Sequence, residues 1–518
     1  MTSLRLALIL VSPVLAGGTA LAAQAVERSD VPERGVLRVT FDPRVMTWND
    51  QFTGAGRVRL GAPLTGDTVG GRFIPAVARL EQSVRIASGI AGFVASLGQG
   101  LLSVRQERRT YPIAGELGIT DRLSVSLLVP IVRVATRSSW QRSNVGANLG
   151  LNPRLAGAAG ADAAYTSFFT QFDTTLTRFD QNISAGQYGC TSTAPCAARD
   201  SSTRWHAVRD ALRTSVYGAG LTGSPFLPLG TSAAGLGIDT TVARIERGLS
   251  LTYGVPGFDT TTTFLLPTDM LTDPLVNQAL IDPRGFGYAA LPFRSSWRYG
   301  LGDVELGAKY RLAAGERYAA ALQAIVRLPT AGRDSADDLL RQSLGDRQLD
   351  LEGHLTQELA VGPLWLNVAV HAGLQRPGTR VRRVAPPDAF LVPATATATL
   401  RWDPGDYAGV DVAPLLRLSR EFAAGFTAGY FTKARDHYAY QSAQDSLDLA
   451  TRTGAATPAS VLEAGTSERR LRLGFAVTYH APMVEGGFSI EQTVSGRGGL
   501  VPGATVYRIV MRASQKLF

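Results

Sequence analysis

The sequence predicts an all-β fold, a transmembrane antiparallel β-barrel of about twelve strands with a long extracellular loop that contains helices. Three observations lead to this prediction. Apolar and polar residues alternate over stretches of roughly ten residues, these stretches pair across short turns, and every second connection is mostly long. A tilted strand needs about 9 to 11 residues to cross a bilayer. Because strands of soluble sandwiches usually have about 5 or 6, the lengths favour the membrane barrel.

The strands are predicted from the period-two alternation. In the segment 348–359, leucines occupy one face and acidic residues, His354 and Thr356 the other. The segment 364–375 repeats the pattern after a turn at Val361-Gly362-Pro363, which completes a hairpin. The predicted strands, in chain order, are 36–48, 112–120, 123–134, 299–312, 318–328, 348–359, 364–375, 410–418, 422–432, 470–480, 488–496 and 505–518.

The long connections are 138–297, 376–407 and 439–466. With a periplasmic N-terminus, all three belong to the extracellular side, where membrane barrels carry their long loops. The pattern in 74–97 is ambiguous between a further helix and a plug near the lumen.

Residues 1–25 have the features of a secretory signal peptide. A single positive charge at Arg5 precedes an apolar stretch and then a run of small residues that ends at Ala25. We expect cleavage after Ala25, with the preceding Ala-x-Ala as the competing site. A retained anchor is the alternative, but the apolar stretch is too short to span a bilayer. The mature barrel would then comprise residues 26–518.

Composition excludes several classes of protein. The chain has 518 residues, 52 Lys plus Arg and 43 Asp plus Glu, and only 18% of its residues are charged. That charge content is too low for a disordered chain. The sequence contains no run of about 18 apolar residues, which excludes a helical membrane protein. The net charge of +9 has no nucleic-acid module beside it, so we expect no nucleic-acid partner.

The hairpin 348–375 contains the one candidate for chemistry. If Leu359 pairs with Leu364, Glu352 lies opposite His371, and His354 is one step away on the same lumen face. Such a group could act as a general base or bind a metal. A polar network that fills the lumen is the favoured interpretation, so we expect no catalytic residue, no metal and no cofactor.

Further charged residues fall on the predicted lumen face. Opposite charges on neighbouring strands would pair and stiffen the wall, and a surplus of arginine could also attract an anionic solute. The lumen-lining candidates beside the hairpin are Arg311, Arg327, Arg417 and Arg472.

The loop 138–297 contains two apolar stripes at helical spacing. They could bury each other as a cap outside the membrane, or the aromatic one could line the mouth and receive apolar ligands, and the two interpretations are compatible. Cys190 and Cys196 lie between the stripes and are predicted to form a local disulfide, with a metal pair as the weaker alternative. The aromatic candidates for the gate are Tyr165, Phe168, Phe169, Phe172 and Phe179.

Two segments carry a resemblance to a known family. They are 115–125, which leads to Val129-Pro130, and 300–312, which is followed by Leu328-Pro329-Thr330. Both resemble a family of Gram-negative outer-membrane β-barrels known as meta-pathway phenol-degradation proteins, which is similar in outline to the long-chain fatty-acid transporters. The final residue, Phe518, resembles the aromatic signal read by the outer-membrane assembly machinery. The apolar residues that precede Phe518 alternate at odd-numbered positions, whereas Phe518 has an even number. Either a bulge resets the register or Phe518 lies outside the lipid-facing stripe.

The resemblance implies a channel or transporter of the Gram-negative outer membrane for passive uptake of small apolar or aromatic molecules. The expected partners of such a channel are outer-membrane lipid and the assembly machinery. The basic net charge makes lipopolysaccharide phosphates at the rim the expected acidic partner. Two alternatives from other classes stay open. One is an outer-membrane lipid or ester hydrolase with a histidine-centred site, and the other is a structural or surface-interaction barrel that acts through its long loop. The sequence determines neither the transported molecule nor the oligomeric state.

Overall fold

A computed structural model describes residues 27–54, 56–190, 196–218, 224–258, 263–289, 293–332, 335–340, 342–481, 484–498 and 501–518. The predicted signal peptide, residues 1–25, lies outside the described residues and stays a prediction. Among the described helices, none is long and apolar enough to cross a membrane.

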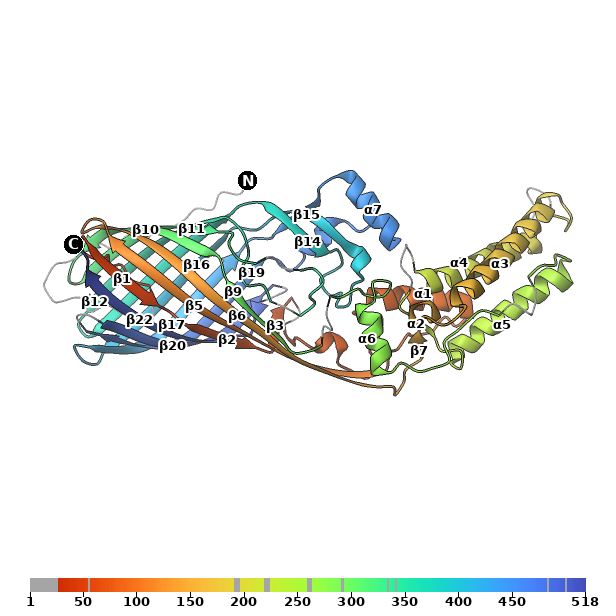
Figure 1. Cartoon of the computed structure of the whole chain (residues 1–518), viewed down its shortest axis with the longest axis horizontal. Coiled ribbons are helices and arrows are strands. Elements are labelled where there is room, and N and C mark those ends of the chain that lie inside the picture. The colour runs from red at the N-terminus through yellow and green to blue at the C-terminus, as the bar shows by residue number, and fades with distance from the viewer. Residues whose placement is uncertain are drawn as a thin grey trace.

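One antiparallel sheet closes on itself to form a barrel (Figure 1). The ring closes where β1 pairs with β22, from Val36 opposite Lys516 to Phe41 opposite Met511. β1 and β2 share one position in the ring, as do β9 and β10, so the ring has twelve positions, as predicted. The strands are β1 (Val36–Phe41), β2 (Arg44–Trp48), β5 (Gln99–Gly118), β6 (Leu123–Ser143), β9 (Ser296–Leu301), β10 (Val304–Ala314), β11 (Tyr318–Leu328), β12 (Asp350–Val361), β13 (Leu364–Gln375), β16 (Tyr407–Arg417), β17 (Phe422–Lys433), β19 (Glu468–His480), β20 (Val484–Arg497) and β22 (Thr505–Lys516).

Two predicted strands are each broken in two. The strand predicted over 36–48 is interrupted between β1 and β2 at Asp42 and Pro43, because proline cannot donate a hydrogen bond to the neighbouring strand. The strand predicted from 299 is interrupted between β9 and β10 at Gly302 and Asp303. The carboxylate of Asp303 instead accepts hydrogen bonds from the backbone of Ala331 and Arg347, which lie in the following loop. Both breaks leave the ring closed, because β1 and β2 each pair with β5 and β22, and β10 pairs with β6 and β11. The other half, β9, pairs with β6.

Apolar side chains cover the outer face of the barrel. On β13 the exposed positions include Leu364, Val370 and Leu374, and on β22 they include Tyr507 and Ile509, which alternate with inward-facing residues. The period-two pattern of the sequence therefore divides an apolar outside from a polar inside.

The hairpin of β5 and β6 is longer than predicted and reaches beyond the barrel. β2 and β9 pair with only 106–110 and 131–136 of these strands. The remaining residues, 99–105 and 137–143, continue as a two-stranded ribbon that connects the wall to the helices at the right of Figure 1. The loop predicted over 138–297 therefore starts after Ser143 and ends before Ser296.

Most of the helices form an elongated extension beyond the end of the barrel opposite the C-terminus, which we call the cap (Figure 1). The prediction for 74–97 is resolved as a helix and not as a plug, because α1 packs against α4 and α5 inside this cap. The cap helices are α1 (Pro75–Ser88), α2 (Pro153–Ala156), α3 (Ala161–Ser184), α4 (Ala197–Tyr217), α5 (Ala233–Arg247) and α6 (Asp273–Ile281), with the short η1 (Ala62–Leu64) and η2 (Gly248–Thr252).

Three small sheets lie outside the ring. They order connections at the end of the barrel that carries the cap, among them the predicted loops 376–407 and 439–466, and α7 (Ala443–Thr453) covers one of the sheets. Their strands are β3 (Asp50–Thr53), β4 (Gly56–Arg59) and β21 (Val501–Pro502); β7 (Leu149–Leu151) and β8 (Phe226–Pro228); and β14 (Gly378–Arg383), β15 (Thr397–Asp403) and β18 (His437–Tyr440). The short helices η3 (Ala394–Ala396) and η4 (Ala459–Glu463) accompany the last of them.

The chain end settles the question of register raised by Phe518. β22 pairs with β20 without a shift from Ala513 to Thr505, and the strand ends at Lys516. Phe518 therefore lies beyond the strand, next to Gly35, and outside the lipid-facing stripe. Of the two alternatives, the structure has the second.

Candidate functional site

The residues that precede β1 fold into the lumen and attach to one side of it. The carboxylate of Glu27 lies 2.8 Å from Nδ1 of His354 on β12, and the Asn367 amide on β13 donates to the Glu27 carbonyl at 2.6 Å. The backbone N–H of Ser29 donates to the Glu358 carboxylate at 2.7 Å. Polar contacts thus hold the segment to β12 and β13.

The same segment also reaches the opposite wall. Arg28 pairs with Glu485 on β20 at 2.5 Å and with Asp30 at 2.8 Å, and Asp30 pairs with Arg38 on β1 at 2.6 Å. Lys309 on β10 donates to the Arg28 carbonyl at 2.9 Å. We call residues 27–30 the crossing segment, because they bridge strands on different sides of the ring. The period-two alternation does not reveal this segment, although its Glu-Arg-Ser-Asp run, a few residues before the first strand, is a signal that could have done so.

A belt of paired charges runs along the inner wall above the crossing segment. Arg327 on β11 contacts Glu305 at 3.0 Å, Asp350 at 3.1 Å and Glu352 at 3.1 Å. The hydroxyl of Tyr407 on β16 donates to Glu352 at 2.7 Å. One arginine therefore joins three strands and contacts three carboxylates.

The belt continues on the other strands of the wall. Asp411 on β16 pairs with Arg472 on β19 at 2.8 Å, and Arg472 pairs with Glu491 on β20 at 3.1 Å. The predicted lumen residues Arg311 and Arg417 lie outside this belt. The Arg311 guanidinium donates to the carbonyl of Asp121 in the β5–β6 turn, and Arg417 closes the strand pairing beside the β12–β13 turn.

The hairpin of β12 and β13 has a different register from the one expected. Leu359 pairs with Leu366 and not with Leu364, so His371 lies opposite His354 and not opposite Glu352. The reason is a tighter turn, in which Gly362 adopts a φ of 58° and only two residues separate the strands. A shift of two residues keeps the same faces inward.

The histidine group is a network of structural contacts. Nδ1 of His354 contacts Glu27 and Nε2 contacts Glu352, both at 2.8 Å, so both ring nitrogens are engaged by carboxylates of the chain. The His371 ring stacks on His354 at a centroid distance of 5.4 Å, and its Nδ1 lies 3.9 Å from Asp411. A general base needs a free nitrogen to accept a proton, and His354 offers none. Among the described residues, no group of three or more metal-ligating side chains could hold a metal ion.

The predicted gate aromatics lie in the interior of the cap. Phe168 packs edge-on to Phe258 at 5.4 Å, Phe172 stacks on Phe258 at 4.4 Å, and Phe179 lies 5.2 Å from Trp205 of α4. The Tyr165 hydroxyl donates to the backbone carbonyl of residue 265 at 2.6 Å. All five rings are buried, so the interpretation as a helical cap describes their position. Their role in ligand capture stays a prediction, and it requires the cap to open.

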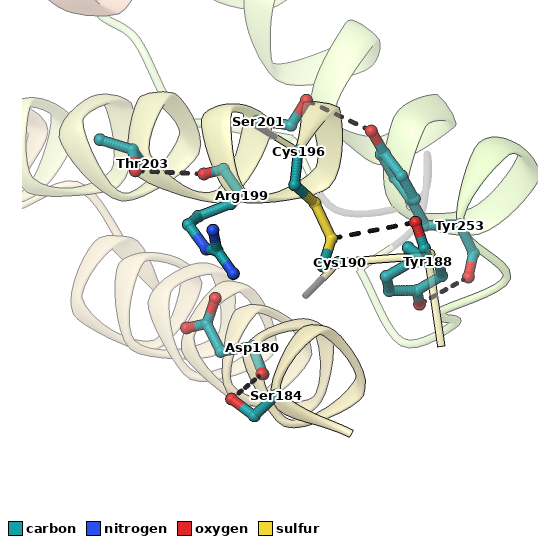
Figure 2. Close-up of a disulfide and its surroundings, with 9 residues drawn as sticks. All are labelled: Asp180, Ser184, Tyr188, Cys190, Cys196, Arg199, Ser201, Thr203 and Tyr253. Carbon is teal, nitrogen blue, oxygen red and sulfur yellow. Dashed lines mark hydrogen bonds between the residues drawn. A yellow bond between two sulfur atoms is a disulfide. The ribbon is translucent and has the colours of Figure 1, made fainter. Parts of the chain in front are cut away.

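A disulfide links the segment after α3 to the start of α4 (Figure 2). Cys190 follows α3 and Cys196 precedes α4, and the two sulfurs are bonded. Beside them the Tyr188 hydroxyl donates to the carbonyl of Tyr253 at 2.9 Å. The cysteines therefore act as a structural pair, which limits how far the adjoining ends of α3 and α4 can separate.

An ion-pair cluster holds the same helices together further along. Asp173 of α3 accepts hydrogen bonds from Arg209 at 2.7 Å and from Arg213 at 2.5 Å, both on α4. Burial by itself would raise the pKa of Asp173, but the two guanidinium groups outweigh it and lower that pKa from its ordinary value. Asp173 therefore stays ionised at neutral pH and links the helices.

A closed antiparallel barrel with an apolar outer face and a lumen lined by paired charges defines the class of transmembrane β-barrels. No family model matches the sequence, and no curated protein matches it. Among solved structures, an outer-membrane channel from Pseudomonas putida F1 is similar with a TM-score of 0.41 and 6% sequence identity, over 95% of this chain and 100% of that chain.

Two transporters of known substrate are also similar. The Ralstonia pickettii toluene transporter TbuX gives a TM-score of 0.31 at 8% identity, over 94% of this chain and 90% of that chain. The Pseudomonas putida toluene transporter TodX gives a TM-score of 0.27 at 10% identity, over 94% of this chain and 90% of that chain. The barrel architecture of the present chain rests on its own strand pairing.

Proposed function

We propose that this protein is a channel of the Gram-negative outer membrane for the passive uptake of small apolar or aromatic molecules. One observation carries the substrate class. A single cluster of buried apolar side chains extends from the aromatic core of the cap to Leu102 and Val104, which lie on the ribbon of β5. An apolar solute that entered the cap would therefore meet apolar contacts as far as the strands that lead into the barrel wall.

The crossing segment supports a regulated path in preference to an open pore. Its contacts with the wall are hydrogen bonds and ion pairs, which can exchange without breaking a covalent bond. In this proposal a solute passes when the segment shifts from the wall. A permanently wide lumen would instead admit hydrophilic solutes without selection.

The resemblance of segments 115–125 and 300–312 to the phenol-degradation barrels supports the same substrate class. We extend the proposal to that family, to export by a signal peptide over residues 1–25, and to insertion by the outer-membrane assembly machinery.

Uptake by intact cells tests the proposal. A Gram-negative strain would express the full chain or carry the empty vector, and the initial uptake rates of a labelled monoaromatic hydrocarbon and of a labelled sugar would be measured. The protein should raise hydrocarbon uptake several-fold and leave sugar uptake unchanged. Equal hydrocarbon uptake in both strains, with the folded barrel present in the outer membrane, would disprove the proposal.

A further inference from the structure

Four arginines gather on the outer face of the β5–β6 hairpin, where the barrel wall passes into the two-stranded ribbon. Arg105 and Arg109 belong to β5, and Arg133 and Arg137 belong to β6. The strand register places Arg105 directly opposite Arg137 and Arg109 directly opposite Arg133. Because directly paired residues of an antiparallel sheet point to the same face, the four side chains form a two-by-two group, which we call the arginine quartet.

The quartet faces away from the lumen. Side chains alternate between the two faces along a strand, and Arg133 lies between Val132 and Val134, which are both buried on the inner side. On the outer side, its nearest neighbours of the same parity include Ile131 on β6, which is 44% exposed. These arginines therefore project into whatever surrounds the barrel.

Like charges that face each other across a strand pair destabilise a sheet. Glu107 is the acidic residue on this face, and it pairs with Arg109 at 2.7 Å. Over the described ranges of the chain, no carboxylate pairs with Arg105, Arg133 or Arg137. The group thus keeps an excess of three positive charges, which an external anion would neutralise.

The position of the quartet along the barrel identifies its surroundings. Ten residues separate Leu123, at the start of β6, from Arg133. At about 3.4 Å per residue and a tilt of about 40°, this distance corresponds to a height of about 26 Å, close to the apolar band of such barrels. The pair of Arg105 and Arg137 lies four residues further out, about 10 Å above.

Aromatic residues on the next strand mark the same level. Trp297 and Tyr299 of β9 point outward, with 64% and 70% of their surface exposed. β9 pairs with β6 so that Tyr299 lies opposite Arg133, and the Arg133 guanidinium lies 5.6 Å from the centroid of the Trp297 ring. Exposed Trp and Tyr are typical of the boundary between hydrocarbon and head groups. The quartet therefore rises from this boundary into the head-group layer on the side of the cap.

We propose that the arginine quartet binds the phosphate groups of a lipopolysaccharide molecule in the outer leaflet. The planar guanidinium matches phosphate oxygens in a two-pronged geometry, and two arginine pairs at different heights can hold two phosphate groups of one glycolipid. The acyl chains would then lie along Ile131 and Leu301 below the quartet. This inference rests on the proposed outer-membrane location but is independent of what the channel transports.

Binding to purified lipopolysaccharide tests this proposal on the folded full chain in detergent. The Kd of fluorescent lipopolysaccharide would be measured for wild type, for Arg105→Gln/Arg137→Gln, and for a control, Arg122→Gln/Arg420→Gln. The control removes two exposed arginines from turns at the opposite end of the barrel. We expect the quartet variant to raise the Kd about tenfold, which corresponds to about 1.4 kcal/mol, and the control to leave it unchanged.

Three further measurements make the outcome unambiguous. The variant Arg105→Lys/Arg137→Lys keeps the positive charges but loses the two-pronged guanidinium geometry. Its affinity for lipopolysaccharide should therefore lie between those of wild type and the Gln variant. Competition with dephosphorylated lipopolysaccharide or with inorganic phosphate at equal concentration should be weak. Heat-dependent migration on gels would verify that each variant is folded. Equal Kd values for wild type and a folded quartet variant, equal losses in the control, or tight binding of the dephosphorylated lipid would overturn the proposal.

Discussion

Asp173 shows how one residue can couple the cap to pH. Its pKa is lowered by Arg209 and Arg213, so its stabilising contribution is complete above the pKa it has in the unfolded chain and is lost as the pH falls through its lower folded value. Because the side chain is partly exposed, solvent screening keeps this contribution modest.

We therefore expect Asp173→Asn to loosen the cap at neutral pH and to have a smaller effect in acid. The measurement is the rate at which a protease cleaves the cap at pH 7 compared with an acid-active protease at about pH 2.5, well below the ordinary aspartate pKa. Wild type should approach the variant only at the acid pH. The matched control is Asp200→Asn, an exposed aspartate on α4. A variant that is as resistant as wild type at pH 7 would refute the role of this cluster.

His354 and His371 test the enzyme interpretation at the same scale. Since both nitrogens of His354 contact carboxylates, we expect the double variant His354→Gln/His371→Gln to keep hydrocarbon uptake within about twofold of wild type. Ester hydrolysis by the purified proteins would be measured in parallel. If wild type cleaves an ester and the folded double variant does not, the histidines form a catalytic site and the protein is an enzyme.

At the scale of elements, the cap contains the interaction that we expect to control entry. The aromatic stripe of α3 packs against Trp205 of α4 and against Phe258 and Phe264. Burial of one Phe contributes about 1.5 to 3 kcal/mol. The residues that flank the segment 160–218 lie close to each other, since the Arg154 guanidinium lies 4.5 Å from the centroid of the Tyr217 ring. The segment can therefore be removed and its ends joined by a short linker.

If α3 and α4 gate entry, this deletion should raise the conductance for small ions in planar bilayers and reduce hydrocarbon uptake, because the channel loses its gate and an apolar capture surface together. Phe172→Leu serves as a control that keeps the cap and a buried apolar side chain. Unchanged conductance and uptake after the deletion would mean that α3 and α4 only cover the surface.

At the scale of the whole molecule, closure of the sheet explains why the chain tolerates a bilayer. Each of the twelve positions in the ring is hydrogen-bonded to two neighbours. This pairing matters in hydrocarbon, where an unpaired backbone group costs several kcal/mol. The outer face can then be apolar throughout the membrane, and charged residues are restricted to the lumen and the rims.

A charge on the lipid face should therefore be costly in a manner that depends on depth. Val370 points outward near the middle of β13, and we expect Val370→Arg to lower the free energy of unfolding by about 2 to 4 kcal/mol. Val361 is the outward-facing end of β12, and Val361→Arg should cost at most about 1 kcal/mol. Urea unfolding in lipid vesicles, followed by heat-dependent gel migration, measures both. Equal costs at the two depths would contradict the membrane position assigned to the wall.

The sequence by itself determined the number of wall positions, the hairpin pairs and the side of each long loop. These features are local, because a period of two and a turn can be recognised within about thirty residues. It also indicated the two cap helices and the inward face of Arg327, Glu352 and His354. A strand has only two faces, so parity alone decides which side chains share a side.

Only the tertiary structure decided what those faces contact. The pairing of His354 with Glu27, the belt around Arg327 and the crossing segment join residues far apart in the chain, and no local pattern specifies which charges meet. The hairpin register depended on the turn, because the left-handed conformation of Gly362 allows only two residues to connect β12 and β13. The alternation along β6 predicts that Arg133 points outward, because it follows the outward-facing Ile131 by two residues. Only the pairing of β5 with β6 shows that the four arginines lie together. Local alternation fixes which way a side chain points, whereas closure of the ring fixes its neighbours.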